Sequence, residues 1–383
     1  MSQQTAPSPS TKPAGAGLEG VVATKSTICF IDGVAGRLVY SGYEIGDLVE
    51  NATFEEVAYL LWEGKLPNKV ELADLREQLG ASMALPAHVH DVIAALPKSA
   101  APMDVLRTAV SALGAADPDL GSNAPDANRR KAIRLTAQFP TIVCAFHRHR
   151  KGESRVDPDP SLSIAANFLY MLFGKKPHET LVRVMDAALV LHAEHGMNAS
   201  TFAARVTAAT LADMHAAVTA ATAALKGPLH GGANQDVMEL LLECGDVESA
   251  RKKVAAKLAG GEKVPGFGHR VYKTFDPRAT FLRKMSKQLG EAAGNTKWYE
   301  MSEAIIPVVK QTKNIDPNVD FFSASAYYTM GIPLDLFTTI FAIARIAGWT
   351  AHIAEQQKNN RIIRPTDEYT GPQGLKVVPI DQR

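Results

Sequence analysis

The chain has 383 residues, of which 46% are hydrophobic and 21% charged, and its formal net charge is +1 at pH 7. This length allows a large core and two domains, and the near-neutral charge gives no electrostatic basis for binding nucleic acid or an acidic membrane. The cysteines Cys29, Cys144 and Cys244 are far apart and belong to no paired motif. We interpret them as free thiols in a reducing compartment.

Residues 1–17 form a tail rich in Ser, Pro and Ala, with one lysine and no apolar run. This composition predicts a disordered tail and is not that of a signal or transit peptide. No run of 18 apolar residues occurs further along, so we expect no membrane-spanning segment. These features predict a cytoplasmic protein.

Residues 19–40 are the only clear strand material, and the turn Asp32-Gly33 between two short β-branched runs predicts a hairpin. Helical periodicity follows, with apolar residues on one side at 54–63 and 104–113. Residues 161–173 are apolar nearly all round, as in a central helix. The sequence therefore predicts a mainly α protein with a small N-terminal β element.

Two further helices are expected at 179–194 and 199–225, where Gly196 ends the first and Asn198 caps the second. His192 and His195 lie at this junction and suggest either a metal site or histidines that contact a ligand or the core. No third ligand occurs at a helical spacing and no cysteine pair supports one, so we predict no metal.

A second feature of the chain is a pair of glycine-rich turns, KGPLHGGAN at 226–234 and KVPGFGHRVYKTFDPR at 263–278. Gly266 and Gly268 permit positive φ and a close approach of the backbone to a ligand. After the second turn, Asp276 and Pro277 are the expected N-cap and first residue of a helix that would end at Gly290. Arg278 falls in its first turn, where a cation is useful mainly if an anion binds; the alternative is a solvated surface arginine.

Each of three loops carries one titratable group: His230, His269 and Asp320. A carboxylate removes a proton next to a carbonyl while a histidine N–H stabilises the developing oxyanion, so the set suits carbon-acid chemistry. Phe321 and Phe322 follow Asp320, and an apolar wall would raise the pKa of that base. Singly, each group could simply cap a helix. Arg345, inside an apolar helix, needs a carboxylate partner from either the protein or a ligand.

Three segments carry a family resemblance: GPLHGGAN at 227–234, VPGFGHRVYKTFDPR at 264–278, and residues 318–356, which begin NVDFFSAS. On these motifs the chain resembles the citrate synthases, in particular the short dimeric bacterial and archaeal type, from residue 17 to residue 372.

The resemblance implies a two-domain, all-α fold. A large, dimer-forming domain would comprise residues 18–230 and 329–383, with a small helical domain inserted at 231–328. It also implies a transferase that condenses acetyl-CoA with oxaloacetate and water, the first step of the tricarboxylic acid cycle. Acetyl-CoA is then a co-substrate, and neither a tightly bound cofactor nor a metal is implied.

The family's catalytic residues fall on His230, His269 and Asp320. Asp320 would take a methyl proton from acetyl-CoA, His230 would bond the thioester oxygen, and His269 would polarise the oxaloacetate ketone. The residues implied for oxaloacetate are His195, Arg278, Arg345 and Arg364, the last reaching the neighbouring subunit's site. The residues implied for CoA are Lys263, Val264, Pro265, Gly266, Phe267, Gly268, Lys273, Lys310 and Lys313.

Two alternatives stay open at this point. The 2-methylcitrate synthases, which use propionyl-CoA, share the catalytic residues and arginines, and the pair Tyr327-Tyr328 differs from the Tyr-His of many relatives of both kinds. The other alternative is a non-catalytic protein that binds CoA or a dicarboxylate on the same scaffold. The intact Asp320 argues against it, because binding alone needs no base.

Overall fold

The computed structural model describes residues 16–18 and 20–383, so most of the predicted disordered tail lies outside the described residues. The first elements are η1 (Ala16–Leu18), β1 (Cys29–Asp32), β2 (Arg37–Tyr40), β3 (Tyr43–Glu44), α1 (Ile45–Asn51), α2 (Phe54–Glu63), α3 (Lys69–Ser82), α4 (Ala87–Ala95), α5 (Pro102–Gly114), α6 (Pro125–Lys151), α7 (Ile164–Phe173) and α8 (Glu179–His192). They are followed by α9 (Ala199–Ala209), α10 (Met214–Leu225), α11 (Ala233–Cys244), α12 (Val247–Ala259), α13 (Pro277–Ala292), α14 (Lys297–Lys313), α15 (Val319–Thr329), η2 (Leu334–Leu336), α16 (Phe337–Lys358) and η3 (Ile380–Gln382).

The predicted N-terminal hairpin is confirmed. Strands β1 and β2 pair antiparallel with Asp32 opposite Arg37, and β3 adds a short third strand. The Asp32 carboxylate accepts hydrogen bonds from the backbone N–H groups of Val34 and Ala35, at 2.9 and 2.8 Å, and so shapes the turn. The turn also contacts the loop that follows His269, because Gly33 O accepts from Lys273 N at 2.8 Å.

Two predicted helix boundaries are wrong. The segment 199–225 is two helices, because Leu211 has a positive φ of 66° and the Asp213 side chain caps α10 by accepting from Ala216 N at 3.0 Å. Helix α13 continues past Gly290 to Ala292. Glycine relieves a close contact at this position, since a Cβ would lie 3.1 Å from the carbonyl oxygen of Asn295.

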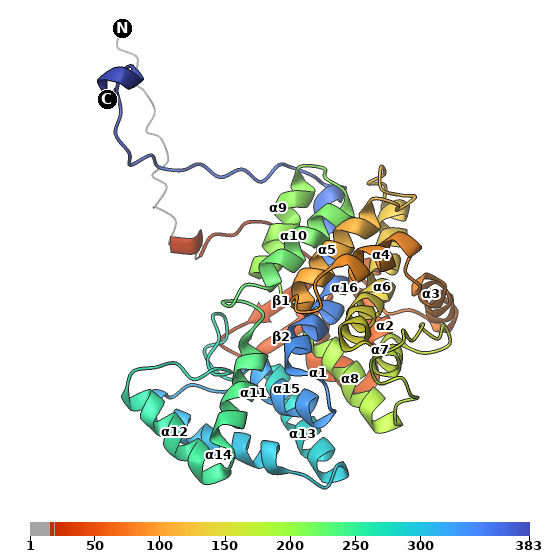
Figure 1. Ribbon diagram of the computed structural model, residues 1–383, viewed down its shortest axis with the longest axis vertical. Coiled ribbons are helices and arrows are strands. Elements are labelled where there is room, and N and C mark those ends of the chain that lie inside the picture. Colours follow the sequence, from red (N-terminus) through yellow and green to blue (C-terminus); the bar gives the residue numbers. More distant parts are fainter. Residues whose placement is uncertain (1–15, 19) are drawn as a thin grey trace.

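Helix α16 is the centre of the larger group of helices. Every residue from 337 to 353 is buried, and α2, α5, α6, α8, α9 and α10 pack around it (Figure 1). The stretch 334–358 is long and apolar enough to span a membrane, with a mean hydropathy of 1.3, but its most apolar window is entirely buried in the fold. It is therefore the core helix of this group of helices.

Helices α11–α15 pack mainly on one another and form the lower part of the molecule in Figure 1. They meet the remaining helices through contacts of α13 with α1 and α8, and of α11 with α16. The catalytic candidates lie where the two groups meet: at the start of α11, in the loop before α13, and at the start of α15. The division into a large domain and an inserted small one stays a prediction.

Candidate active site

The Pro-Gly-Phe-Gly turn before His269 is held in a conformation that only glycine allows. Gly266 has φ 77°, and a Cβ there would lie 2.7 Å from Val237 Cγ2 and 2.8 Å from Phe321 Cδ2. Both contacts are far inside van der Waals distance, so any side chain would push the turn away from α11 and α15.

Asn318 joins this turn to the helix of the candidate base. Its backbone N–H donates to Gly266 O at 2.9 Å, and its side-chain Nδ2 donates to Gly268 O at 2.9 Å. The same side chain caps α15 by accepting from Asp320 N at 3.0 Å. Asn318 thus fixes the position of the loop before His269 relative to the start of the helix that carries Asp320.

Asp320 lies in the first turn of α15 and not in a loop. The pKa of its carboxyl is raised to about 6, mainly by burial; Arg278 opposes the shift and Asp276 adds to it. Phe321 and Phe322 beside it are buried. No described residue donates a hydrogen bond to its carboxylate, so both oxygens are left for a substrate. At neutral pH this is an ionised base with a raised pKa.

His269 presents a neutral N–H donor. Its Nδ1 accepts from the backbone N–H groups of Val271 at 3.0 Å and Tyr272 at 3.3 Å. Burial, together with the charge of Arg278, lowers its pKa to about 4. A neutral ring that accepts at Nδ1 carries its proton on Nε2, so Nε2 is the nitrogen that can polarise a substrate oxygen.

His230 has the opposite tautomer. Its Nε2 accepts from the backbone N–H of Ser200 at 3.3 Å, and this bond sets the tautomer. The Ser200 hydroxyl lies 2.8 Å from the same nitrogen, donates to Asn198 Oδ1 at 2.7 Å and accepts from Trp349 Nε1 at 3.1 Å. Burial and Arg345 lower the pKa of His230 to about 4. The proton of this neutral ring is therefore on Nδ1. Ser200 was missed from the sequence, because a serine in the first turn of α9 gives no signal of its partner 30 residues away.

Arg278 is buried, with only 2% of its surface exposed, and is held by its own N-cap. Asp276 accepts from Arg278 Nε at 2.9 Å and from Nη2 at 2.8 Å, and it also accepts from Val319 N at 3.1 Å. The solvated-arginine alternative is therefore wrong. Asp276 was predicted only as a cap; its second role, fixing a guanidinium between α13 and α15, depends on tertiary contacts.

Arg345 carries a buried nitrogen that has no hydrogen-bond partner among the described residues. Its Nε donates to His192 O at 2.7 Å and its guanidinium lies 4.6 Å from the Phe341 ring centroid, but the buried Nη2 has no partner. The nearby buried carboxylate of Glu194 lies 3.0 Å from His352 Nε2 and makes no hydrogen bond to Arg345. Of the two partners open at the sequence level, a ligand carboxylate is favoured.

His195 is buried, and its Nε2 lies 3.2 Å from the hydroxyl of Tyr272. Its ring centroid is 5.0 Å from that of His269, which brings two of the predicted residues together. His192 bonds Ala188 O through Nδ1 at 2.7 Å. Within residues 16–18 and 20–383, no three His, Cys, Asp or Glu side chains are grouped as metal ligands.

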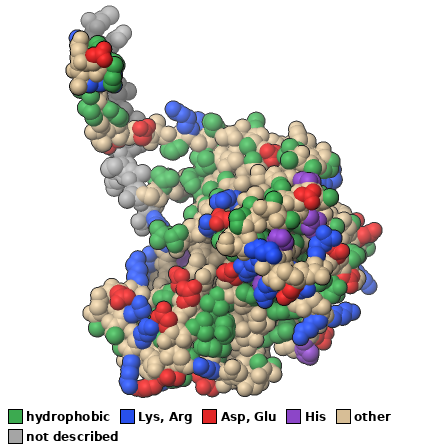
Figure 2. Space-filling view, in the orientation of Figure 1, with side chains coloured by type: hydrophobic (Ala, Val, Ile, Leu, Met, Phe, Trp, Pro, Cys, Tyr) green, Lys and Arg blue, Asp and Glu red, His purple; other side chains and the backbone are tan. Residues whose placement is uncertain are grey.

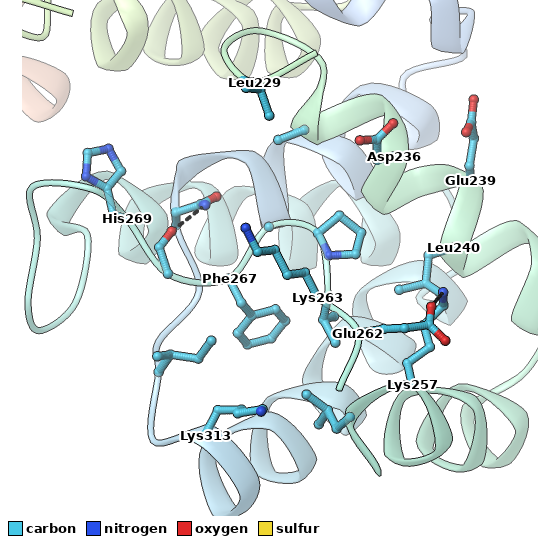
Figure 3. Close-up of a pocket in the computed structure, with 18 of the residues that line it drawn as sticks. Leu229, Asp236, Glu239, Leu240, Lys257, Glu262, Lys263, Phe267, His269 and Lys313 are labelled. Carbon is cyan, nitrogen blue, oxygen red and sulfur yellow. Dashed lines mark hydrogen bonds and ion pairs between the residues drawn. The ribbon is translucent and has the colours of Figure 1, made fainter. Parts of the chain in front are cut away.

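A cavity of about 950 Å³ opens beside His269 (Figure 3). All six residues from 263 to 268 line it, as does Lys313, and Lys257 and Arg270 add basic groups that the sequence did not single out. Lys273 and Lys310 do not line it. The Lys310 ammonium is bound to Asp316 at 2.6 and 2.7 Å.

Arg364 is not brought to the other residues. The chain after α16 leaves the body and stands clear of it (Figures 1 and 2), and Arg364 is exposed with no hydrogen bond or ion pair to the described part of the chain. Its predicted role therefore depends on another chain.

A base with a raised pKa, two neutral imidazole donors and two buried guanidiniums are the groups needed to form an enolate beside a carboxylate substrate. The family model described as citrate synthase, C-terminal domain, matches residues 17–366. Citrate synthase 2 of Bacillus subtilis is 52% identical, covering 96% of this chain and 98% of its own. A 2-methylcitrate synthase of Shewanella oneidensis is 44% identical with the same coverage.

A solved structure agrees with these matches. The citrate synthase of Thermoplasma acidophilum, solved as a ternary complex with carboxymethyl coenzyme A and oxaloacetate, has a TM-score of 0.90 at 34% identity, covering 96% of this chain and 98% of its own. The chain belongs to the citrate synthase family. The expected mainly α fold and the expected acyltransferase class are confirmed by this membership.

Proposed function

We propose that this chain condenses acetyl-CoA with oxaloacetate and water to give citrate and CoA. The observation that carries the proposal is the protonation pattern of the site. His230 and His269 are both neutral and held by backbone N–H groups on opposite ring nitrogens, so each offers one N–H donor. Asp320 is ionised at neutral pH, with a pKa raised to about 6 by burial.

The reaction follows from these roles. Asp320 takes a proton from the methyl carbon of acetyl-CoA, and the C–H electron pair moves toward the thioester oxygen, which accepts a hydrogen bond from His230 Nδ1. The enol carbon then attacks the ketone carbon of oxaloacetate. The ketone oxygen is stabilised by the Nε2–H of His269 and takes up a proton to become the hydroxyl of citryl-CoA, which balances the proton taken by Asp320. Water cleaves the C–S bond of citryl-CoA and releases citrate and the CoA thiol.

Oxaloacetate and CoA have separate binding groups in this proposal. Arg278, Arg345 and His195 hold oxaloacetate, which supplies the carboxylate that Arg345 Nη2 lacks. The cavity lined by residues 263–268 takes CoA, with Lys313 at its rim. The relative from Thermoplasma acidophilum was solved with oxaloacetate and a CoA analogue, which supports the same pair of substrates here.

The test is release of free thiol from acetyl-CoA or propionyl-CoA, at equal concentration, with oxaloacetate present. We expect acetyl-CoA to be preferred. A preference for propionyl-CoA would make the chain a 2-methylcitrate synthase, a candidate supported by the 44% identical relative of that name. One methylene is worth only about 1–3 kcal/mol of discrimination, so both rates need measuring. No thiol release from either substrate would leave a binding protein only and refute the proposal.

We further propose a homodimer in which Arg364 enters the partner's oxaloacetate site. The support is the C-terminal segment, which stands clear of the body and carries exposed apolar side chains. Ile362 is 60% exposed, Tyr369 62% and Val377 88%. Apolar side chains on an extended arm gain stability when a second copy covers them. A two-fold dimer would exchange two such arms symmetrically.

Mixing two inactive variants tests the shared site. Asp320→Ala and Arg364→Ala chains, unfolded together and reassembled, would form hybrid dimers with one doubly damaged site and one intact site. Random reassortment then restores about a quarter of parental sites. Activity that stays at the level of the separate variants would place Arg364 outside the partner's site, because every site would carry one lesion.

Helices α11–α15 act in this proposal as an inserted small domain that closes over the substrates and excludes water. Oxaloacetate is then expected to raise the affinity for acetyl-CoA, and titrations without such coupling would contradict closure. A place at the first step of the tricarboxylic acid cycle, in the cytoplasm, is part of the same proposal.

A further inference from the structure

The loop between His269 and α13 carries a tyrosine that neither the mechanism nor the binding groups above use. Tyr272 is only 3% exposed, although it lies in a loop without regular secondary structure. Its ring centroid is 4.8 Å from that of His269 and 5.5 Å from that of His195. With the 5.0 Å contact between the two histidines, the three rings form one closed cluster.

The hydroxyl of Tyr272 makes a specific contact within this cluster. It lies 3.2 Å from His195 Nε2, whereas His195 Nδ1 has no hydrogen bond to any described residue. Burial raises the pKa of the Tyr272 phenol, so the hydroxyl keeps its proton and can donate. A neutral His195 that accepts at Nε2 carries its own proton on Nδ1. Nδ1 is then the nitrogen left to donate to a substrate oxygen.

The position of Tyr272 is set from the other side by the N-terminal hairpin. Lys273 N donates to Gly33 O at 2.8 Å, next in sequence to Tyr272. A Cβ at residue 33 would lie 2.2 Å from the carbonyl oxygen of Val271 and 2.9 Å from its carbonyl carbon. The hairpin turn therefore presses directly on the loop backbone, and only glycine at residue 33 leaves room for it.

We propose that Tyr272 is a positioning residue for oxaloacetate: its hydroxyl fixes the ring plane and tautomer of His195, and the hairpin turn at Gly33 holds the tyrosine in place. The inference rests on the proposed function, since His195 is assigned there to oxaloacetate. Tyr272 then orients both histidines, because its backbone N–H also donates to His269 Nδ1 at 3.3 Å.

The test is Tyr272→Phe, which keeps the ring cluster and removes one hydroxyl. Loss of a single neutral hydrogen bond predicts an increase of about 3- to 10-fold in both the oxaloacetate Kd, from calorimetry without acetyl-CoA, and the oxaloacetate KM. We expect kcat and the acetyl-CoA KM at saturating oxaloacetate to stay within twofold, because the backbone bonds that orient His269 remain. The side-chain ¹⁵N signals of His195 should move, which a purely structural role would not cause. Tyr170→Phe, in α7, is the matched control and should behave as the parent.

A second variant tests the hairpin. Gly33→Ala should raise the oxaloacetate Kd at least as much as Tyr272→Phe, whereas Gly121→Ala, whose Cβ would meet nothing within 4 Å, should not change it. Parental oxaloacetate Kd and unmoved His195 signals in Tyr272→Phe would overturn the inference while leaving parental turnover, and so the proposed function, intact. An equal loss of affinity for both substrates with a lowered Tm would also overturn it, as a stability effect. A parent that neither binds oxaloacetate nor releases thiol would refute the proposed function as well.

Discussion

Asp276→Asn tests how far the site depends on a carboxylate that does not react. The two carboxylate oxygens of Asp276 accept four hydrogen bonds: from Arg278 N, Nε and Nη2, at 3.0, 2.9 and 2.8 Å, and from Val319 N at 3.1 Å. In asparagine an NH2 group would replace one carboxylate oxygen, and this hydrogen-bond donor would face two N–H donors. It would also leave the buried guanidinium without its counter-charge.

The expected magnitude follows from that geometry. Breaking a buried ion pair by removing one charge costs about 3–5 kcal/mol, a large share of a typical unfolding free energy of about 5–15 kcal/mol. We expect a loss of this size in chemical unfolding of Asp276→Asn, together with a raised oxaloacetate KM. Asp213→Asn is the matched control: Asp213 is also an N-cap, of α10, and asparagine caps a helix about as well as aspartate. Its stability should stay within about 0.5 kcal/mol of the parent.

A second readout of the same variant separates charge from folding. Asp276 raises the pKa of Asp320, and Arg278 lowers it. Removing the negative charge and leaving Arg278 unpaired both stabilise ionised Asp320, so the acid limb of the kcat/KM profile should move to lower pH. Parental stability, or an acid limb that moves to higher pH, would refute this account of Asp276.

The remaining predictions concern the base and the turn. Asp320→Asn should keep oxaloacetate binding, measured by calorimetry, and lose about 10²–10⁴ in turnover; turnover within a few-fold of the parent would contradict its role as base. In the parent, kcat/KM for acetyl-CoA should fall about tenfold per unit below the raised pKa of Asp320, about 6, because the protonated form cannot accept the methyl proton; a flat profile down to pH 5 would argue against it. Gly266→Ala should lower both stability and acetyl-CoA affinity, because a Cβ would lie 2.7 Å from Val237 Cγ2. Gly294→Ala also places alanine at a positive φ, of 64°, but its Cβ meets no neighbour within 4 Å. This variant should therefore lose stability and keep its acetyl-CoA affinity.

The sequence by itself determined the local structure and the chemical types at the site. The start of α13 at Asp276-Pro277, the hairpin around Asp32 and the cap at Asn198 depend on side chains that bond backbone groups a few residues away, which short sequence patterns record. The histidines beside glycines and the aspartate before two phenylalanines indicated carbon-acid chemistry for the same reason, because the flanking residues that suggest each role are adjacent in the sequence.

Only the tertiary structure decided which nitrogen of each histidine carries the proton and which charges lack a partner. His230 depends on Ser200, 30 residues away, and Arg345 depends on the absence of any hydrogen-bonded carboxylate around its Nη2 among the described residues. The tautomers and the unpaired charge depend on contacts between segments far apart in the sequence, and no local sequence pattern encodes such contacts. The break in the segment 199–225 has the same origin, since helix periodicity continues through it while Leu211 turns the backbone.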